Sequence, residues 1–151
     1  MFKKLLNKKL LKNQKGLTLV ELLAVVVILA IVAAIAIPAI GNIIENSRYT
    51  AVKADAINVI NAANLYYTDT PDSTATSVTA ATLREKGFLK STGKLPDTAS
   101  VAKDDLKLST IVTKVFPYNI EFNGTTLDAI NKDTKKGSDI KSAYIVGTET
   151  K

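Results

Sequence analysis

The feature that most constrains this chain is a long run of apolar residues near its N-terminus. Leu22–Ile40 contains 19 residues without a charged side chain, interrupted only by Pro38. Counted from Leu17, the stretch has 24 residues and a single acid, Glu21. At a rise of roughly 1.5 Å per residue, a helix of this length crosses a hydrocarbon core of roughly 30 Å. The run therefore predicts a membrane-spanning helix.

The residues before this run carry the whole net charge of the chain. Six lysines and no acid precede Gly16, whereas the rest of the chain holds 14 basic and 14 acidic side chains. Because basic residues favour the cytoplasmic side of a span, this end is predicted to face the cytoplasm. The high pI belongs to this head alone, so no direct nucleic-acid binding is predicted. The basic residues of the head are Lys3, Lys4, Lys8, Lys9, Lys12 and Lys15.

Composition also excludes several kinds of chemistry. The chain has no Cys and no His, so it cannot form disulfides, thiol nucleophiles, Cys/His zinc sites or triads with an imidazole base. It contains no Gly-rich phosphate loop. The acid pairs Asp104-Asp105 and Asp69 with Asp72 lie in polar stretches typical of a solvated surface. We predict no catalytic residues, no cofactor and no metal site, and therefore a protein that is not an enzyme.

The junction between the basic head and the apolar run has a specific pattern. It reads Lys15-Gly16-Leu17-Thr18-Leu19-Val20-Glu21. Over roughly residues 12–45 the chain resembles the class III signal and N-terminal helix of type IV pilins and their pseudopilin relatives. The resemblance implies cleavage between Gly16 and Leu17 by a prepilin peptidase, and then methylation of the Leu17 amine. Phenylalanine is the commonest residue at that position in the family, so leucine departs from the pattern.

The resemblance also implies how the chain is organised and where it works. Residues 1–16 would be a basic leader that is removed, 17–40 the transmembrane and assembly half of a long helix, and 41–151 a globular headpiece with the second half of that helix. The product would sit in the cytoplasmic membrane with its N-terminus inside, and then enter an extracellular filament at the cell surface. Its partners would be other pilin subunits in a homo-oligomeric filament, the prepilin peptidase and methyltransferase, and a membrane assembly platform.

Three residues of the long helix carry specific expectations. An acid within a membrane span is costly, and the family implies that Glu21 pairs with the Leu17 amine of a neighbouring subunit and sets the register of assembly. The alternative is that Glu21 only reaches the cytoplasmic interface. Pro38 and Gly41 are expected to kink the helix, and the resemblance implies that the helix melts near them when subunits pack in a filament.

Three alternatives stay open. One is a pseudopilin of a type II secretion or competence system, which no residue distinguishes from a pilin. Another is a single-span, membrane-anchored binding module, which predicts an uncut N-terminus and no role for Glu21. The third follows from Ala34-Ile35-Ala36, which fits the small-x-small rule of ordinary signal peptides. Cleavage before Ile37 would release a secreted soluble domain.

After Gly41 the pattern becomes amphipathic. Apolar residues recur at steps of three and four up to Tyr67, and Thr68-Asp69-Thr70-Pro71 predicts the end of the helix. A near-continuous helix from Leu17 to Tyr67 would be roughly 75 Å long. One face of its second half is expected to lie under the headpiece. That face contains Ile44, Tyr49, Val52, Ala56, Val59 or Ile60, Ala63 and Tyr67.

The remainder predicts a small antiparallel sheet packed on the second half of the helix, and hence an α+β, pilin-like fold. Residues 70–81 are expected to be an exposed loop, and 131–139 a polar loop before the last strand. The expected strands lie around Leu106 and Leu108, and over Ile111–Val115, Tyr118–Phe122 and Ser142–Val146.

Two short motifs predict local structure in the headpiece. Thr82-Leu83-Arg84-Glu85 has the spacing of a capping box, which predicts a short helix over residues 81–86 that ends at Gly87. Asn123-Gly124 predicts a hairpin turn. With Thr125 it also matches an N-glycosylation acceptor, but the turn alone accounts for it.

Overall fold

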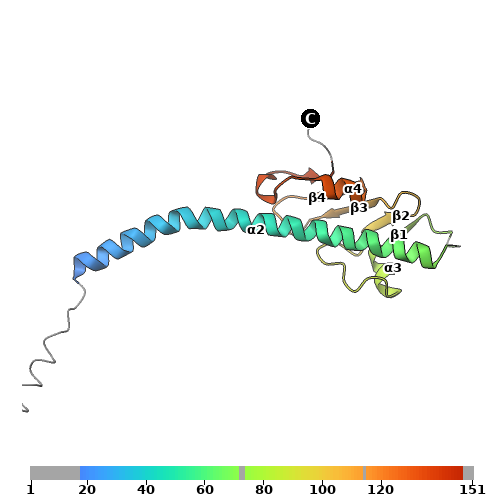
Figure 1. Ribbon diagram of the computed structural model, residues 1–151, viewed down its shortest axis with the longest axis horizontal. Coiled ribbons are helices and arrows are strands. Elements are labelled where there is room, and N and C mark those ends of the chain that lie inside the picture. Colours follow the sequence, from blue (N-terminus) through green and yellow to red (C-terminus); the bar gives the residue numbers. More distant parts are fainter. Residues whose placement is uncertain (1–17, 72–73, 114, 148–151) are drawn as a thin grey trace, which may run out of the picture. The chain divides into compact units, whose positions relative to one another are not determined.

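The computed structural model describes residues 18–71, 74–113 and 115–147. The chain divides after Ile40 into two parts, and the long helix α2 begins in the first part and ends in the second. Figure 1 shows the elements in chain order. The helices are α2 (Leu19–Asp69), α3 (Ala80–Glu85), α4 (Leu127–Lys132) and the 3-10 turn η1 (Gly137–Asp139). The strands are β1 (Ser77–Thr79), β2 (Ser100–Ala102), β3 (Leu108–Val112), β4 (Ile120–Thr125) and β5 (Tyr144–Ile145).

The first part consists, where it is described, of Thr18 and the beginning of α2. This stretch supplies a helix long and apolar enough to cross a membrane, by its length and composition. Its side chains are exposed along its length, with Ala36 half-buried. The helix runs without a break through Pro38 and Gly41, and Ile37 before the proline stays helical.

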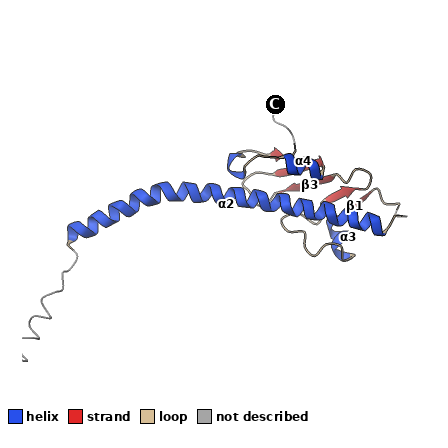
Figure 2. Cartoon of the chain, viewed as in Figure 1, coloured by secondary structure: helices blue, strands red, loops and turns tan. Residues whose placement is uncertain are grey.

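The second part is organised around a five-stranded sheet whose spatial order follows the chain order, β1 to β5. The neighbours β1 to β4 pair in an antiparallel manner, whereas β5 pairs with β4 in a parallel manner. The expected α+β architecture is confirmed, and the sheet is mixed instead of wholly antiparallel. A parallel neighbour needs a crossover connection, and the segment with α4 and η1 provides it (Figure 2).

The second half of α2 contributes one face to the core of this part. Every predicted core position from Tyr49 to Tyr67 is buried, and Val59 and Ile60 are both buried rather than one of them. Ile44 is the exception, because it is 45% exposed. The Tyr67 hydroxyl donates to the Val101 carbonyl at 2.9 Å, which fastens the end of α2 to β2.

The expected loop over residues 70–81 is wrong in its second half, where β1 and the start of α3 lie. Three residues of β1 pair with β2, with Val78 opposite Val101. The cap of α3 is Thr79, whose side chain accepts from the Thr82 backbone at 3.3 Å, so the capping role expected of Thr82 belongs to Thr79. Gly87 ends the helix as predicted, with a φ of 83° that suits glycine.

The boundaries of β3, β4 and β5 differ from the predicted ones by a few residues, β2 was not predicted, and two local predictions are wrong. Leu106 has a φ of 51° and lies in a turn before β3. Asn123-Gly124 lies inside β4 and is not a hairpin turn. Between the pairs Leu108 with Thr125 and Thr110 with Phe122 the register shifts, so two residues of β4 face one of β3. Gly124 has a positive φ of 62°, and the chain uses this glycine in a β-bulge.

The expected polar loop over residues 131–139 contains the end of α4 and the turn η1. Thr126 caps α4 by accepting from the Ala129 backbone at 3.2 Å. Beyond α4, Gly137 lies so close to α2 that an added Cβ would overlap the Glu45 carbonyl. The Ser138 backbone donates to the Asn46 side chain at 2.9 Å, so the crossover is held against α2.

Candidate functional site

The candidate site at the start of α2 is built from Thr18 and Glu21. The Thr18 backbone N–H and its hydroxyl both donate to Glu21 Oε2, each at 2.8 Å. In return, the Glu21 backbone N–H donates to Thr18 Oγ1 at 3.2 Å. Leu22 N donates to the Thr18 carbonyl at 3.0 Å, so Thr18 is the cap of the helix. The two residues form a reciprocal capping box, which satisfies backbone donors that a helix start leaves open.

This arrangement gives the carboxylate of Glu21 a defined position. The acid lies in the first turn of α2, where the positive end of the helix dipole favours a negative charge. Its two partners come from one residue, so the carboxylate is hydrogen-bonded within its own chain. The site therefore combines a negative charge, an apolar helix and a bonding pattern that does not need a second molecule.

Thr18 is the functional candidate that sequence reasoning missed. The spacing Thr18-x-x-Glu21 is the same capping-box pattern that was noted at Thr82-x-x-Glu85. The structure forms the box at Thr18 and Glu21, whereas α3 is capped by Thr79. The capping-box pattern was present in the sequence. Glu21 was interpreted only as a partner of a neighbouring subunit, so its partner within the chain, Thr18, was missed.

Of the other predicted residues of this segment, Pro38 and Gly41 lie further along α2 and away from Thr18 and Glu21. Gly16 and Leu17 lie outside the described residues, so the geometry of the expected cleavage site is not described. Pro38 is exposed within the unbroken helix. An added Cβ at Gly41 would meet no atom within 4 Å, so this glycine is not required by packing within the subunit. The kink or melt at Pro38 and Gly41 stays a prediction.

The apolar side chains of the first half of α2 form an exposed surface on all sides of the helix. The exposed fractions of the large apolar side chains run from 49% at Val25 to 81% at Leu19. A contiguous apolar surface of this kind on a protein marks a membrane or protein contact. The large apolar residues of this surface are Leu19, Val20, Leu22, Leu23, Val25, Val26, Val27, Ile28, Leu29, Ile31, Val32, Ile35, Ile37 and Ile40.

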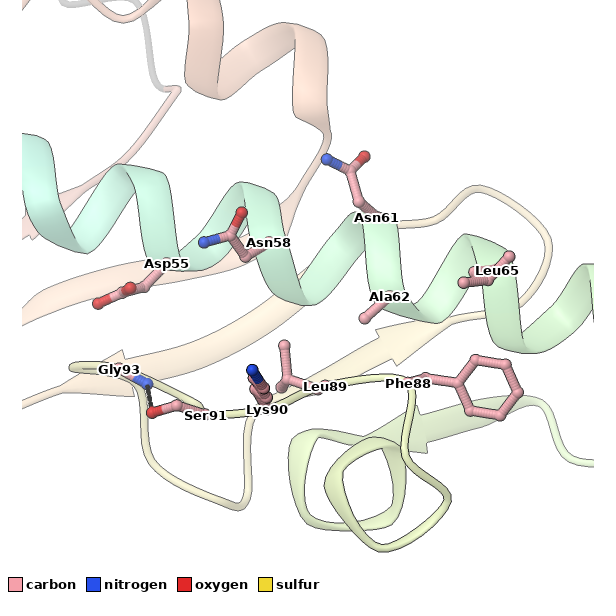
Figure 3. A pocket seen from close by; sticks show the side chains of 10 residues that line it. All are labelled: Asp55, Asn58, Asn61, Ala62, Leu65, Phe88, Leu89, Lys90, Ser91 and Gly93. Atoms are coloured by element: carbon pink, nitrogen blue, oxygen red, sulfur yellow. Dashed lines mark hydrogen bonds between the residues drawn. The ribbon is translucent and has the colours of Figure 1, made fainter.

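The second part contains an open cleft of about 530 Å³ between α2 and the segment that follows α3 (Figure 3). Among the described residues that line it, Asp55 of α2 is the one carboxylate, and it accepts from the Lys94 backbone at 2.8 Å. This carboxylate therefore holds the loop in place. Among residues 18–71, 74–113 and 115–147, no group of three or more His, Cys, Asp or Glu side chains could hold a metal ion.

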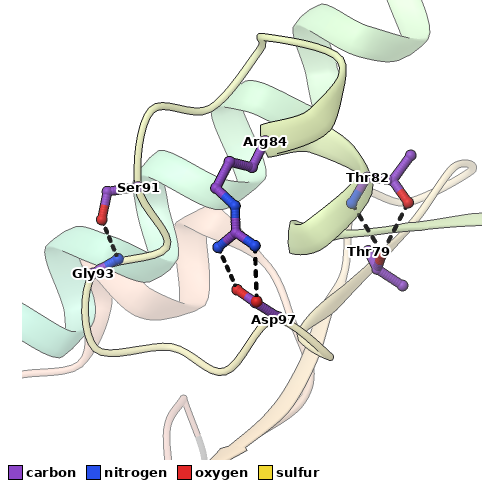
Figure 4. A network of polar contacts seen from close by, with 6 residues as sticks. All are labelled: Thr79, Thr82, Arg84, Ser91, Gly93 and Asp97. Carbon is purple, nitrogen blue, oxygen red and sulfur yellow. Dashed lines mark hydrogen bonds and ion pairs between the residues drawn. The ribbon is translucent and has the colours of Figure 1, made fainter.

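Two acids on the surface of this part form ion pairs within the subunit. Asp105 pairs with Lys107 at 2.6 Å, which accounts for one acid of the Asp104-Asp105 pair. Arg84 of α3 makes a two-pronged ion pair with Asp97, at 2.7 and 2.9 Å (Figure 4). The hydrogen bonds from Arg84 lower the pKa of the Asp97 carboxyl. In turn, the bonds to Asp97 raise the pKa of the Arg84 guanidinium.

Comparison with known families supports the interpretation of the N-terminal segment. Residues 11–37 match the family described as a prokaryotic N-terminal methylation motif. The match supports a prepilin signal of the type IV pilin kind, and the matched residues extend into the long apolar helix that begins at Leu19. Neither the curated proteins nor the solved structures include a match. The motif is of the kind found in pilins and pseudopilins, and it does not distinguish one filament system from another.

Proposed function

We propose that this protein is a structural subunit of a type IV pilus or a related filament, assembled through the first half of α2. The observation that carries the proposal is the methylation motif over residues 11–37 together with an apolar helix exposed on all sides. Such a helix needs lipid around it before assembly and other helices around it afterwards. The leader would keep the N-terminus in the cytoplasm, and the headpiece would lie on the outer side.

Processing would begin with the prepilin peptidase, which cuts between Gly16 and Leu17 and leaves the apolar helix on the product. The amine of Leu17 that this cleavage frees would then be methylated. An assembly platform driven by an ATPase elsewhere would extract the subunit from the membrane and add it to the fibre. Glu21 would pair with the Leu17 amine of a neighbouring subunit, because two unpaired charges in an apolar core are costly.

The capping box adds a step to this scheme. In the isolated subunit, Thr18 supplies two hydrogen bonds to the Glu21 carboxylate. A charge that is hydrogen-bonded is less costly in an apolar medium than a bare one. We infer that Thr18 keeps the Glu21 carboxylate hydrogen-bonded in the membrane. During assembly, the Leu17 amine of a neighbouring subunit would then bind this carboxylate, either in place of Thr18 or together with it. Thr18→Ser should then support assembly, and Thr18→Ala should reduce it.

The first test is the intact mass and N-terminal sequence of the protein recovered from cells. A start at Leu17, with or without one added methyl group, supports class III processing. A start at Met1 would favour the membrane-anchored module, and a start at Ile37 would favour the secreted domain. Either of these two results would contradict the proposed function.

The second test separates assembly from membrane insertion. Glu21→Ala should abolish incorporation into filaments while the protein stays in the membrane fraction. Glu45→Ala is the matched control, because Glu45 is an acid of the same helix whose Lys141 partner is 4.0 Å away. The control should assemble normally. If Glu21→Ala also assembles normally, Glu21 has no role in register and the anchored module is favoured.

The pseudopilin alternative shares every feature above. A pseudopilin builds a short filament by the same chemistry, so filament length under overexpression is the measurement that compares the two. Long surface fibres under native expression would favour a pilin.

A further inference from the structure

Asn123-Gly124 is the sequence motif that the filament proposal does not use. The dipeptide forms the bulge of β4, where it faces Ser109 of β3. Asn123 is exposed, and Gly124 has a φ of 62°, a conformation that side chains other than glycine rarely adopt. The bulge therefore requires glycine at position 124. As a consequence, β4 carries an exposed asparagine followed directly by a glycine.

This dipeptide has a reactivity of its own. The backbone nitrogen of Gly124 can lose its proton and attack the side-chain carbonyl carbon of Asn123. A C–N bond forms, ammonia leaves, and the product is a five-membered cyclic imide. Water then opens the ring to aspartate or to isoaspartate, in which the main chain runs through the side-chain carbon. Glycine has no Cβ to obstruct the approach, so this dipeptide is sterically open to the reaction.

The reaction requires that Gly124 N lose its proton and that this nitrogen approach the Asn123 side-chain carbonyl. The structure restrains both steps. Gly124 N donates to Ser109 Oγ at 3.2 Å, so the attacking nitrogen holds its proton in a hydrogen bond. The pairs Thr110 with Phe122 and Leu108 with Thr125 fix the backbone on both sides of the bulge. We propose that Asn123-Gly124 is a deamidation site and that the Ser109 hydroxyl shields it in the folded protein.

The consequence of losing the shield can be derived from the neighbours. Isoaspartate at position 123 adds a main-chain atom between Phe122 and Thr125, which are 1% and 5% exposed. The Thr125 hydroxyl donates to the Val146 carbonyl at 3.2 Å, directly after β5. A change in the spacing between Phe122 and Thr125 would therefore disturb both the core and the attachment of β5. The shield protects the register of the strand that holds the C-terminal edge of the sheet.

The test is peptide mapping by mass spectrometry of the full chain in detergent, incubated for weeks at neutral pH and body temperature. Deamidation raises the peptide mass by about one dalton, and isoaspartate separates from aspartate by chromatography. Ser109→Ala should deamidate at Asn123 about fivefold faster than the wild type, the effect of one lost hydrogen bond. Ser109→Thr keeps the hydroxyl and should stay near the wild-type rate. The chain in urea should react fastest of all.

Ser100→Ala is the matched control. The Ser100 hydroxyl contacts the Ser109 carbonyl at 3.5 Å and is not bonded to Gly124, so this variant should behave as the wild type. Asn46, which precedes Ser47 in α2, is the internal reference, because general unfolding would raise its rate too. A rise confined to Asn123 supports the proposal. Equal rates in Ser109→Ala and wild type would overturn it, and so would equal rates in the folded and urea-treated wild type. None of these outcomes depends on filament formation.

Discussion

The two halves of α2 are both helical, but the apolar side chains of the first half are exposed and those of the second half are largely buried. Ile28 in the first half is 60% exposed, and Ile60 in the second half is 2% exposed. The first half is apolar on every side, so no single sheet could cover it. The second half has an apolar face and a polar face, and the sheet covers the apolar one. The comparison shows that the distribution of apolar residues around a helix decides what can bury it, whereas their number does not.

The polar residues of the two halves differ as well. In the second half, polar side chains fasten loops: Asn46 accepts from Ser138, Asp55 accepts from Lys94, and Lys53 donates to the Asp133 carbonyl. In the described part of the first half, the polar pair is Thr18 and Glu21, and they bond to each other. The second half is thus built to be fixed within its own subunit, and the first half is left available to other molecules.

The matched pair Ile60→Ala and Ile28→Ala tests this comparison most strongly. Ile60→Ala removes buried methyl groups from the core and should lower the free energy of unfolding of the headpiece by about 2–5 kcal/mol. Ile28→Ala changes an exposed side chain and should leave that free energy within about 0.5 kcal/mol of the wild type. The measurement is urea unfolding of the full chain in detergent, followed by tyrosine fluorescence, since the chain has five Tyr and no Trp. Equal losses in both variants would contradict the division of α2.

A glycine pair gives the next largest effect. A Cβ at Gly137 would overlap the Glu45 carbonyl and lie near the Tyr49 side chain, so Gly137→Ala should push the crossover away from α2. The expected loss is about 1–3 kcal/mol in the same urea experiment. Gly41→Ala is the control, because that Cβ meets nothing within 4 Å. In an exposed helix interior, alanine is favoured over glycine by about 0.5–1 kcal/mol.

Gly41→Ala also bears on the proposed melt. If the helix has to melt near Pro38 and Gly41 during assembly, a better helix former at position 41 should slow the incorporation of subunits. Filament yield at fixed protein level is the readout. Unchanged yield together with a more stable helix would argue against a melt at this glycine.

The contact between the crossover and α2 includes a network of two tyrosines and one acid, which predicts a pH dependence. The hydroxyls of Tyr49 and Tyr144 both donate to Asp133 Oδ2, at 2.8 and 3.1 Å. Burial, followed by the nearby Asp133 carboxylate, raises the pKa of Tyr144 to about 12. Burial and the hydrogen bond to Asp133 raise the pKa of Tyr49 as well.

The direction of the pH effect follows from these pKa values. The folded state holds the tyrosine protons more tightly than the unfolded state, whose tyrosines titrate near pH 10. The stability from this network is therefore complete below pH 10 and is lost as the pH rises toward about 12, the pKa of folded Tyr144. Tyr144→Phe should cost about 1 kcal/mol at neutral pH and should flatten the fall above pH 10. Urea midpoints measured across that range would show it, and an unchanged slope in Tyr144→Phe would count against the network.

Much of the fold followed from patterns that depend on near neighbours in the sequence. The apolar run, the amphipathic face after Gly41 and the end of α2 at Asp69 follow from residue spacing along one helix, and the structure agrees with them. The glycine at position 87 also acted locally, as a helix end. These features need no knowledge of what lies elsewhere in the chain.

Several of the predictions that failed depend on partners far away in the sequence. Ser77–Thr79 forms a strand because β2 pairs with it, and three residues of Ser, Val and Thr give no distinct pattern on their own. Asn123-Gly124 was predicted to form a hairpin turn, but only the pairing of β4 with β3 decides between a turn and a bulge. The parallel placement of β5 depends on how the crossover packs against α2. Of the candidate site, Glu21 was singled out because it is an acid in an apolar run, and the capping-box spacing Thr18-x-x-Glu21 would have added Thr18.

The smallest predicted effect concerns Arg84 and Asp97, whose side chains bond to each other on the surface of the headpiece. Their ion pair is bidentate but exposed, with side chains 44% and 49% accessible. Exposed pairs are screened by water and salt, so Arg84→Ala should lower the Tm by at most about 3 °C. Because Arg84 lowers the pKa of Asp97, its stabilising effect should be present at neutral pH and decline as acid protonates the carboxylate. High salt should also weaken it. Differential scanning calorimetry of wild type, Arg84→Ala, Asp97→Ala and the double variant would isolate the pair. A coupling as large as the Ile60→Ala loss would mean that surface charges, and not the buried face of α2, hold the headpiece together.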